Sequence, residues 1–266
     1  MRASSSILAL LLVLGLAGCA TDLDDARDSA LAYFAAEVES VDPGWAQLFG
    51  YMHRRFGLTA WDAAGRPLHE IPEGQERPEI AAIYRRLSDP SAGISMRQIA
   101  ALPTAIDRIT ASALHCDRIP LPMDWPRVLR QAADLGGYAL THAAVASQWT
   151  LENGCVPATA LAALQREQVD RLIQLVRHRD ALAGHMEASQ DIWIEAIAML
   201  YYLGAGDRVE LAWIREMVQA QRPDGSWAHH PRSEQSDPHT TALALWVLLE
   251  QLQPDAPPIS WVPPRG

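Results

Sequence analysis

The sequence predicts an all-α protein built from about five outer and inner helix pairs. Good helix formers such as Ala, Leu, Arg and Gln dominate, and alternating runs rich in β-branched residues are absent. Amphipathic segments alternate with segments that are apolar almost all round, as exposed outer helices and buried inner helices do. His142, Asp191 and His239 recur 49 and 48 residues apart, each near the start of an apolar segment. That period is typical of stacked helix pairs.

The C-terminal half of the chain contains three such pairs. Outer helices are expected over 124–135, 158–179 and 208–221, and inner helices over 138–151, 190–203 and 238–252. A Gly-Gly pair separates the two helices of the first pair, and polar loops separate the helices of the other two. Each inner helix therefore follows its outer partner along the chain.

The N-terminal half repeats one signal of this plan. Asp42-Pro43 and Asp89-Pro90 stand 47 residues apart and match Asp237-Pro238, an N-cap residue followed by Pro at the first helical position. Inner helices are therefore expected to start near 42 and 90, as well as near 138, 190 and 237. Residues 66–77 are expected to form a loop, and the Pro-rich tail 254–266 to lie extended on the surface. One domain is expected over residues 19–253.

Residues 1–18 are expected to be a signal peptide. Met1-Arg2 is positively charged, and Ile7 to Leu16 is apolar but too short to span a membrane as a mature helix. The end of the segment, Leu16-Ala17-Gly18-Cys19, resembles the lipobox of bacterial lipoproteins. The resemblance implies cleavage before Cys19, a lipid such as palmitate on that residue, and, with Ala20 after it, an outer-membrane location facing the periplasm. The alternative is an ordinary secretory signal with an incidental cysteine.

Composition limits the partners of the chain. The formal net charge is −10 and every basic side chain other than His is Arg. Without a basic cluster the chain is not expected to bind nucleic acid, since phosphate neutralisation requires one. The same charge argues against direct adhesion to anionic lipid, so membrane attachment would come from the lipid on Cys19.

Two cysteines follow Cys19. In an oxidising periplasm, two leftover thiols are expected to pair, which makes Cys116 and Cys155 disulfide candidates. The alternative is a catalytic or zinc-ligating cysteine, which the absence of a CxxC cluster disfavours.

One motif carries a family resemblance. Residues 221–227 match Q-x-x-x-G-x-W, with Gln221, Gly225 and Trp227, and resemble the QW motif of the triterpene cyclases, whose relatives include the protein prenyltransferases. The resemblance implies an α/α toroid in which the motif braces the link between an outer helix and the next inner helix. No Asp-x-Asp-Asp motif or Asp-rich diphosphate site is present. The motif is therefore interpreted as structural, without terpene chemistry.

The candidate site lies at the starts of the three C-terminal inner helices. If these helices run parallel, His142, Asp191, Glu195 and His239 meet at one end of the array. Two imidazoles and two carboxylates suit a divalent metal, zinc first among them. Without a metal, His142 or His239 beside Glu195 is expected to act as a general acid/base pair, with Glu195 and His142 as the first choice of catalytic residues.

Each residue also has a purely structural interpretation. A buried histidine can be a hydrogen-bonded core residue, Asp191 can favour the helix dipole, and Asp237 can be an N-cap. Glu195 is the hardest to explain this way, because an ionised carboxylate in an apolar helix needs a partner. His229 and His230 are expected to be exposed in the loop after Trp227, and His185 and Glu187 are rim candidates in the equivalent loop.

Two functions follow from this site. The first is a lipid-anchored envelope enzyme, a hydrolase or lyase acting on a periplasmic small molecule. The second is a non-catalytic lipoprotein that binds a ligand or an envelope protein. The sequence contains no nucleophile elbow, phosphate loop, dinucleotide fingerprint or HExxH motif, which excludes the enzyme classes that depend on them.

Overall fold

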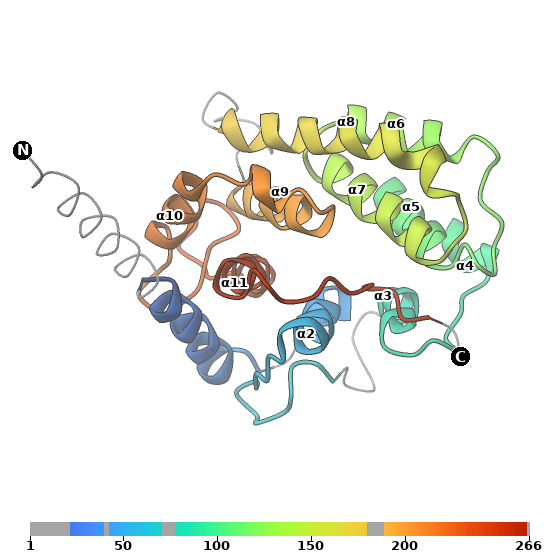
Figure 1. Cartoon of the computed structure of the whole chain (residues 1–266). Coiled ribbons are helices and arrows are strands. Elements are labelled where there is room, and N and C mark those ends of the chain that lie inside the picture. The colour runs from blue at the N-terminus through green and yellow to red at the C-terminus, as the bar shows by residue number, and fades with distance from the viewer. Residues whose placement is uncertain (1–21, 40–42, 71–77, 180–188, 265–266) are drawn as a thin grey trace, which may run out of the picture.

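The computed structural model describes residues 22–39, 43–70, 78–179 and 189–264 (Figure 1). Within these ranges the regular secondary structure is helical, apart from two isolated bridges that pair Trp61 with Pro67 and Trp227 with Asp237. The all-α prediction is therefore confirmed for the described part of the chain. Residues 1–18, the expected signal peptide, and Cys19 lie outside it.

The helices follow one another with short connections. The first covers residues 22–37. The others are α2 (Pro43–Phe56), α3 (Pro78–Tyr84), η1 (Arg85–Leu87), α4 (Met96–Ala100), α5 (Ala105–Leu114), α6 (Trp125–Asp134), α7 (Gly137–Glu152), α8 (Ala158–Arg177), α9 (Gln190–Tyr202), η4 (Gly206–Arg208), α10 (Leu211–Gln219) and α11 (Pro238–Leu252).

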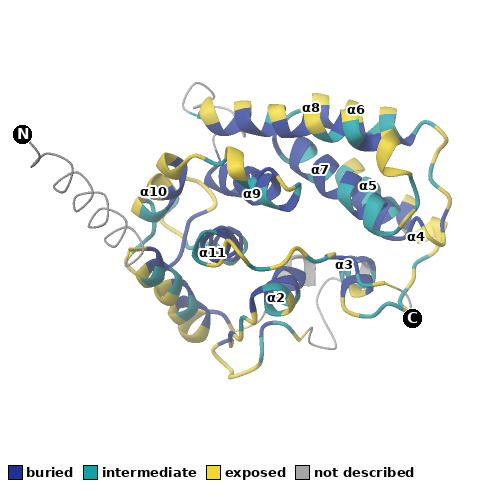
Figure 2. Cartoon of the chain, viewed as in Figure 1, coloured by how far each residue is buried: buried dark blue, intermediate teal, exposed yellow. Residues whose placement is uncertain are grey.

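The C-terminal half matches the predicted helix pairs. Helices α6 to α11 fall on the six predicted segments, with the start of the last outer helix formed by the short η4 instead of α-helix. Helix α9 is buried along its whole length except at Tyr201, and α11 is buried from Thr240 to Glu250. Figure 2 shows this contrast with α8, whose outward side is exposed. The alternation of amphipathic and apolar segments therefore did distinguish outer from inner helices.

The predicted helix start near residue 90 is wrong. Asp89 instead organises a turn, in which its Oδ1 accepts from the Ser91 backbone N–H (2.8 Å). The next helices begin later, after the N-cap residues Ser95 and Thr104. An Asp-Pro pair suits a turn as well as a helix start, and only the residues that follow decide between them. The start near 42 agrees with α2, whose first residue is Pro43, although Asp42 itself lies outside the described residues.

Six of the described helices contact one another in a closed circle. Helix α2 contacts α3, and the contacts continue through α5, α7, α9 and α11, which in turn contacts α2. Helix α6 packs on α7, α8 packs on α7 and α9, and α10 packs on α11 (Figure 1). The α/α toroid of about five pairs implied by the sequence resemblance remains a prediction. The contacts show a closed circle of six helices, with α6, α8 and α10 packed against members of that circle.

The QW-like segment braces the link between α10 and α11. The Trp227 indole is fully buried and its Nε1–H donates to Met217 O (2.7 Å). The Gln221 amide donates to Ala26 O (2.8 Å) in the first helix and to Gly225 O (2.9 Å). Gly225 has φ +87°, and a Cβ at this position would lie 2.1 Å from Ser29 O. Only glycine therefore lets the turn approach the first helix so closely.

Cys116 and Cys155 form a disulfide, with their Cα atoms 6.1 Å apart. The bond joins the end of α5 to the loop after α7. The predicted pairing is confirmed, and it removes these thiols as candidate nucleophiles or metal ligands.

The C-terminal tail lies on the surface over residues 254–260, as expected, but the residues that follow enter the domain. Trp261 and Val262 are buried. The Val262 backbone N–H donates to Glu152 Oε2 (2.9 Å), and the Arg54 guanidinium donates to Trp261 O (2.8 Å). The segment is Pro-rich and non-helical, but these polar contacts and the Trp261 ring make it part of the domain core.

None of the described helices is both long enough and apolar enough to cross a membrane.

Candidate functional site

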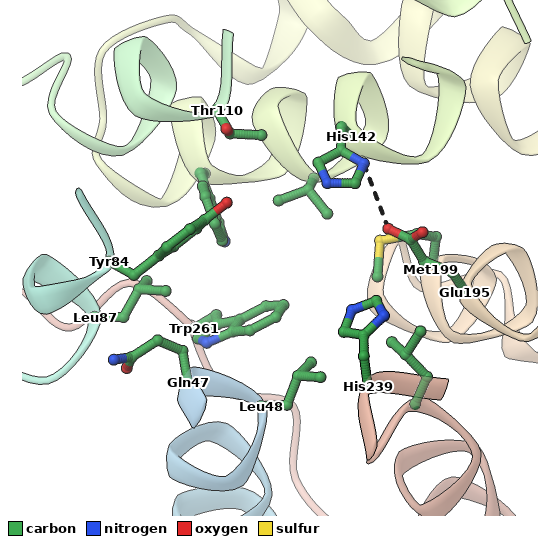
Figure 3. Close-up of a pocket in the computed structure, with 13 residues that line it drawn as sticks. Gln47, Leu48, Tyr84, Leu87, Thr110, His142, Glu195, Met199, His239 and Trp261 are labelled. Atoms are coloured by element: carbon green, nitrogen blue, oxygen red, sulfur yellow. Dashed lines mark ion pairs between the residues drawn. The ribbon is translucent and has the colours of Figure 1, made fainter. Parts of the chain in front are cut away.

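One pocket opens among the inner helices and contains about 480 Å³ of empty space, including the part open to solvent. Its wall draws on every helix of the ring and on the C-terminal tail (Figure 3). The lining residues are Gln47, Leu48, Tyr84, Leu87, Thr110, His142, Val145, Trp149, Glu195, Met199, His239, Leu243 and Trp261. Three of the four predicted site residues are therefore in the pocket wall.

Asp191 supports His239 from behind the pocket. Its side chain is almost completely buried, and its Oδ1 lies 2.8 Å from His239 Nδ1. The Thr240 hydroxyl lies 2.7 Å from the same oxygen and can donate to it, while the Tyr138 hydroxyl donates to Oδ2. The Asp191 backbone N–H donates to His229 O (3.1 Å). Asp191 is thus held as an ionised acceptor with donors on both oxygens.

The same contacts shift two pKa values apart. Burial alone would raise the pKa of Asp191, but the charge and hydrogen bond of His239 outweigh it and lower that pKa to about 2. Burial alone would lower the pKa of His239, but the charge and hydrogen bond of Asp191 raise it to about 9. Near neutral pH the two residues therefore form an ion pair, and the His239 ring carries both protons.

His142 and Glu195 form a second pair in the same pocket. His142 Nδ1 lies 2.9 Å from Tyr138 O and 3.5 Å from Glu195 Oε1 (Figure 3). A carbonyl oxygen can only accept, so the Nδ1 atom carries the proton. In the neutral ring the lone pair is then on Nε2, and the side chain is partly exposed in the pocket wall.

Glu195 is in a different environment from Asp191, although the two are one turn apart on α9. Its carboxyl is buried, and Oε2 has no hydrogen-bond partner among the described residues. Burial raises the pKa of Glu195, against the opposing effect of His142. The uncharged carboxyl is therefore favoured here more than at an exposed glutamate.

The four predicted residues thus come together as two carboxylate–imidazole pairs. The sequence analysis paired His142 with Glu195 but did not pair His239 with Asp191, since the period in the sequence gives the register of the helices but not the contacts between them. Tyr138 and Thr240, which bind Asp191, were not assigned this role, although both stand in the first turns that the pattern marks. Thr110 and Trp261 had no signal in the sequence that linked them to the site.

A metal has a different set of ligands available from the one predicted. Asp191, Asp237 and His239 each bring one ligand atom within 4.8 Å of the others. These atoms are already hydrogen-bonded: Asp237 Oδ1 accepts from the Thr240 backbone N–H (2.7 Å) as the N-cap of α11, and Asp191 holds His239. A cation bound there would replace these bonds. The predicted set of His142, Asp191, Glu195 and His239 with zinc remains a prediction.

One histidine of the loop after Trp227, His229, lies at the edge of the site. His229 and His230 are exposed, as expected. The His229 ring stacks on Tyr138 with centroids 6.3 Å apart, and its Nδ1 lies 4.0 Å from Asp191 Oδ2. His185 and Glu187 lie outside the described residues.

Comparisons of the chain with protein-family models, with curated proteins and with solved structures found no match. The interpretation of the site therefore rests on its geometry.

Proposed function

We propose that the pocket is the active site of an enzyme that transfers protons between its substrate and two histidines. One observation supports the proposal above the others. Each imidazole is bound through Nδ1 on the protein side, has a buried carboxyl next to it, and borders the same pocket. Paired titratable groups whose environments move their pKa values apart are typical of acid–base catalysis.

His142 is the proposed general base. Its Nδ1–H is fixed by Tyr138 O, so that Nε2 is the atom able to accept a proton from water or substrate. The Glu195 carboxyl, 3.5 Å from Nδ1, lies where positive charge develops as the ring becomes protonated. Glu195 then stabilises the imidazolium, and its buried position strengthens that interaction.

His239 is the proposed general acid. Because Asp191 raises its pKa to about 9, the ring is protonated at neutral pH and can donate from Nε2 to a leaving oxygen or to a developing oxyanion. Asp191 holds the ring in one orientation throughout. Together the two histidines support a hydrolysis, with water as the nucleophile, or an elimination, with a substrate proton removed by His142.

The proposal includes a location in the cell. The lipobox-like segment supports a protein anchored through Cys19 in the cell envelope, where a small molecule of the periplasm would be the substrate. A role as a non-catalytic binding lipoprotein is the alternative that the experiment below distinguishes.

The test compares the wild type with Glu195→Gln and His142→Ala after incubation with a small-molecule extract of a bacterial envelope. We expect products detectable by mass spectrometry to accumulate with the wild type. Their rate should fall about 100-fold or more in either variant, the usual effect of losing a general acid or base. His230→Ala, a change at an exposed histidine outside the pocket, is the matched control and should keep full activity. No product that depends on the wild type, or equal rates in all variants, would contradict the proposal.

A further inference from the structure

The pocket is built in layers along three parallel inner helices. α7, α9 and α11 each contribute one residue to each layer. The first layer, nearest the N-terminal ends of the helices, is His142, Glu195 and His239, and its two histidines are partly exposed. The next layers, Val145, Met199 and Leu243 and then Trp149, Tyr202 and Trp246, are buried. Along these helices the residues at this register thus change from polar to apolar to aromatic, and of the three aromatic residues only Trp149 lines the pocket.

Helical geometry explains why the layers form. Residues three, four and seven apart lie on one face of a helix, so each helix directs one residue per turn towards the same axis. Seven residues rise by roughly 10 Å, which separates the polar layer from the aromatic one. All three helices must run in the same direction, because their polar residues meet in one pocket and their aromatic residues meet around one side chain.

That side chain is Trp261 from the C-terminal tail. Its ring lies 5.5 Å from the ring of Trp149, 5.5 Å from that of Tyr202 and 5.4 Å from that of Trp246, centroid to centroid. Trp261 lines the pocket, whereas Tyr202 and Trp246 do not. The tail therefore closes the inner end of the pocket and covers two of the three aromatic residues of the deepest layer.

The tail is fixed in this position. The Arg54 guanidinium and the Glu152 carboxylate bind the C=O and the N–H of the peptide unit between Trp261 and Val262, and Arg86 donates to Pro263 O (2.9 Å). Because Arg54 and Arg86 hold the tail and the Trp261 indole is buried, the inner end of the pocket is closed.

We infer that the pocket takes a small amphiphile whose carboxyl head, as acid or ester, lies at His142 and His239, while its short apolar chain points inward and ends at Trp261. The residue Trp261 then determines how long that chain can be. The position of the head rests on the proposed function, but binding of the chain requires no turnover.

The polar layer favours a carboxyl head over a phosphate. None of the described residues that line the pocket is Arg, and the chain contains no Lys. Phosphate sites in proteins draw on several such cations, whereas one charged imidazole suits a singly charged or uncharged carboxyl oxygen. The second layer, with Val145, Met199 and Leu243, offers the chain only apolar contacts.

The test measures binding of straight-chain carboxylates from acetate to dodecanoate by isothermal titration calorimetry. Affinity should rise roughly fourfold for each methylene that the pocket buries, and then fall once the chain is longer than the pocket. Trp261→Ala should move this limit to longer chains. Met199→Phe, which fills the middle layer, should move it to shorter ones. Trp61→Ala, a change at a half-exposed indole outside the pocket, should leave the limit unchanged.

The two substitutions shift the limit in opposite directions, so loss of folding in one of them does not remove the test. No binding by the wild type, an affinity that ignores chain length, or a limit that stays the same in both variants would overturn the inference. A length limit without any catalysed reaction would contradict the proposed enzyme and keep the inferred ligand. Catalysis without a length limit would support the proposed enzyme and contradict the inferred ligand.

Discussion

Asp191 and Glu195 stand one turn apart on α9, yet their environments shift their pKa values in opposite directions, downwards for Asp191 and upwards for Glu195. Asp191 accepts hydrogen bonds from Tyr138 and Thr240 as well as from His239, whereas Glu195 Oε2 has no partner among the described residues. Both carboxyls are buried, so hydrogen bonding and the neighbouring charge decide between them. Helix α9 thus supplies an ionised carboxylate, Asp191, and a second carboxyl group, Glu195, whose pKa is raised.

The ion pair of Asp191 and His239 should stabilise the fold within a defined pH window. The raised pKa of His239 means that its contribution is complete below its ordinary value of 6.5 and is lost as the pH rises through about 9. The lowered pKa of Asp191 means that its contribution is complete above 3.8 and is lost as the pH falls through about 2. The pair should therefore contribute fully between those two ordinary values.

We expect His239→Gln to lower the free energy of unfolding by about 1–3 kcal/mol within this window, because the buried Asp191 charge loses a partner. The deficit should shrink towards pH 9. Urea denaturation at several pH values measures it, and side-chain NMR of the wild type should show one histidine that titrates near pH 9. If every histidine titrates near 6.5, or the deficit is the same at all pH values, the ion pair is not formed as described.

Metal content tests the ligand set that the sequence suggested. Because the oxygens of Asp191 and Asp237 already accept protein hydrogen bonds, we expect far less than one divalent metal per chain in protein purified without chelator or affinity metal. Elemental mass spectrometry measures this on a form that starts after Cys19. Near-stoichiometric zinc that disappears in a folded His142→Ala/His239→Ala variant would instead support metal catalysis.

For single residues, the sequence predicted which positions belong to the site better than it predicted which side chains contact one another. The recurrence of His142, Asp191 and His239 reflects a helix register, which repeats along the chain and is readable from spacing. The pairing of His239 with Asp191 depends on how neighbouring helices rotate about their axes, which spacing does not record. Trp261 could not be assigned to the site at all, because an indole in a Pro-rich tail gives no periodic signal.

Among the helices and their connections, the QW-like turn shows how a single backbone position holds an outer helix against an inner one. Gly225 combines a positive φ with a close approach to Ser29 O in the first helix. Gly204, in the turn after α9, also has a positive φ of +73°, but a Cβ there would meet nothing within 4 Å. A substitution at Gly204 therefore tests the effect of the positive φ alone, whereas one at Gly225 tests the positive φ together with a steric clash.

We expect Gly204→Ala to destabilise the protein by about 1–2 kcal/mol, the effect of an unfavourable φ alone. Gly225→Ala should cost about 3 kcal/mol or more, since the first helix must also move away from the added methyl group. Chemical denaturation of both variants gives the comparison. Equal losses in the two would mean that the contact with Ser29 is not maintained in solution.

Helix boundaries were predictable in the C-terminal half and not in the N-terminal half, for one reason. Helices α7, α8, α9 and α11 have 13 to 20 residues and show a clear amphipathic or apolar period, whereas α3 and α4 have only seven and five. Where the helix is short, its start can be predicted only from an N-cap signal such as Asp89-Pro90, and the same residue types also form turns.

For the molecule as a whole, the disulfide between Cys116 and Cys155 is a crosslink over 39 residues. In the chain-entropy description, closing a loop of this size stabilises the folded state by about 4 kcal/mol. We expect Cys116→Ser/Cys155→Ser to lose up to that amount, measured by urea denaturation against the oxidised wild type. Adding a reductant should lower the stability of the wild type but not that of the variant. Two titratable thiols in the native, unreduced protein would contradict the bond.

The closed circle of contacts from α2 round to α11 also means that no inner helix of the described ring is at an end. In an open stack of helix pairs, the terminal pairs have one uncovered side, fray first, and need a specialised polar cap. Here the contact between α2 and α11 gives every inner helix a neighbour on both sides. Loss of any one helix would expose apolar surface on two others, so the ring is expected to melt as one cooperative unit rather than pair by pair from an end.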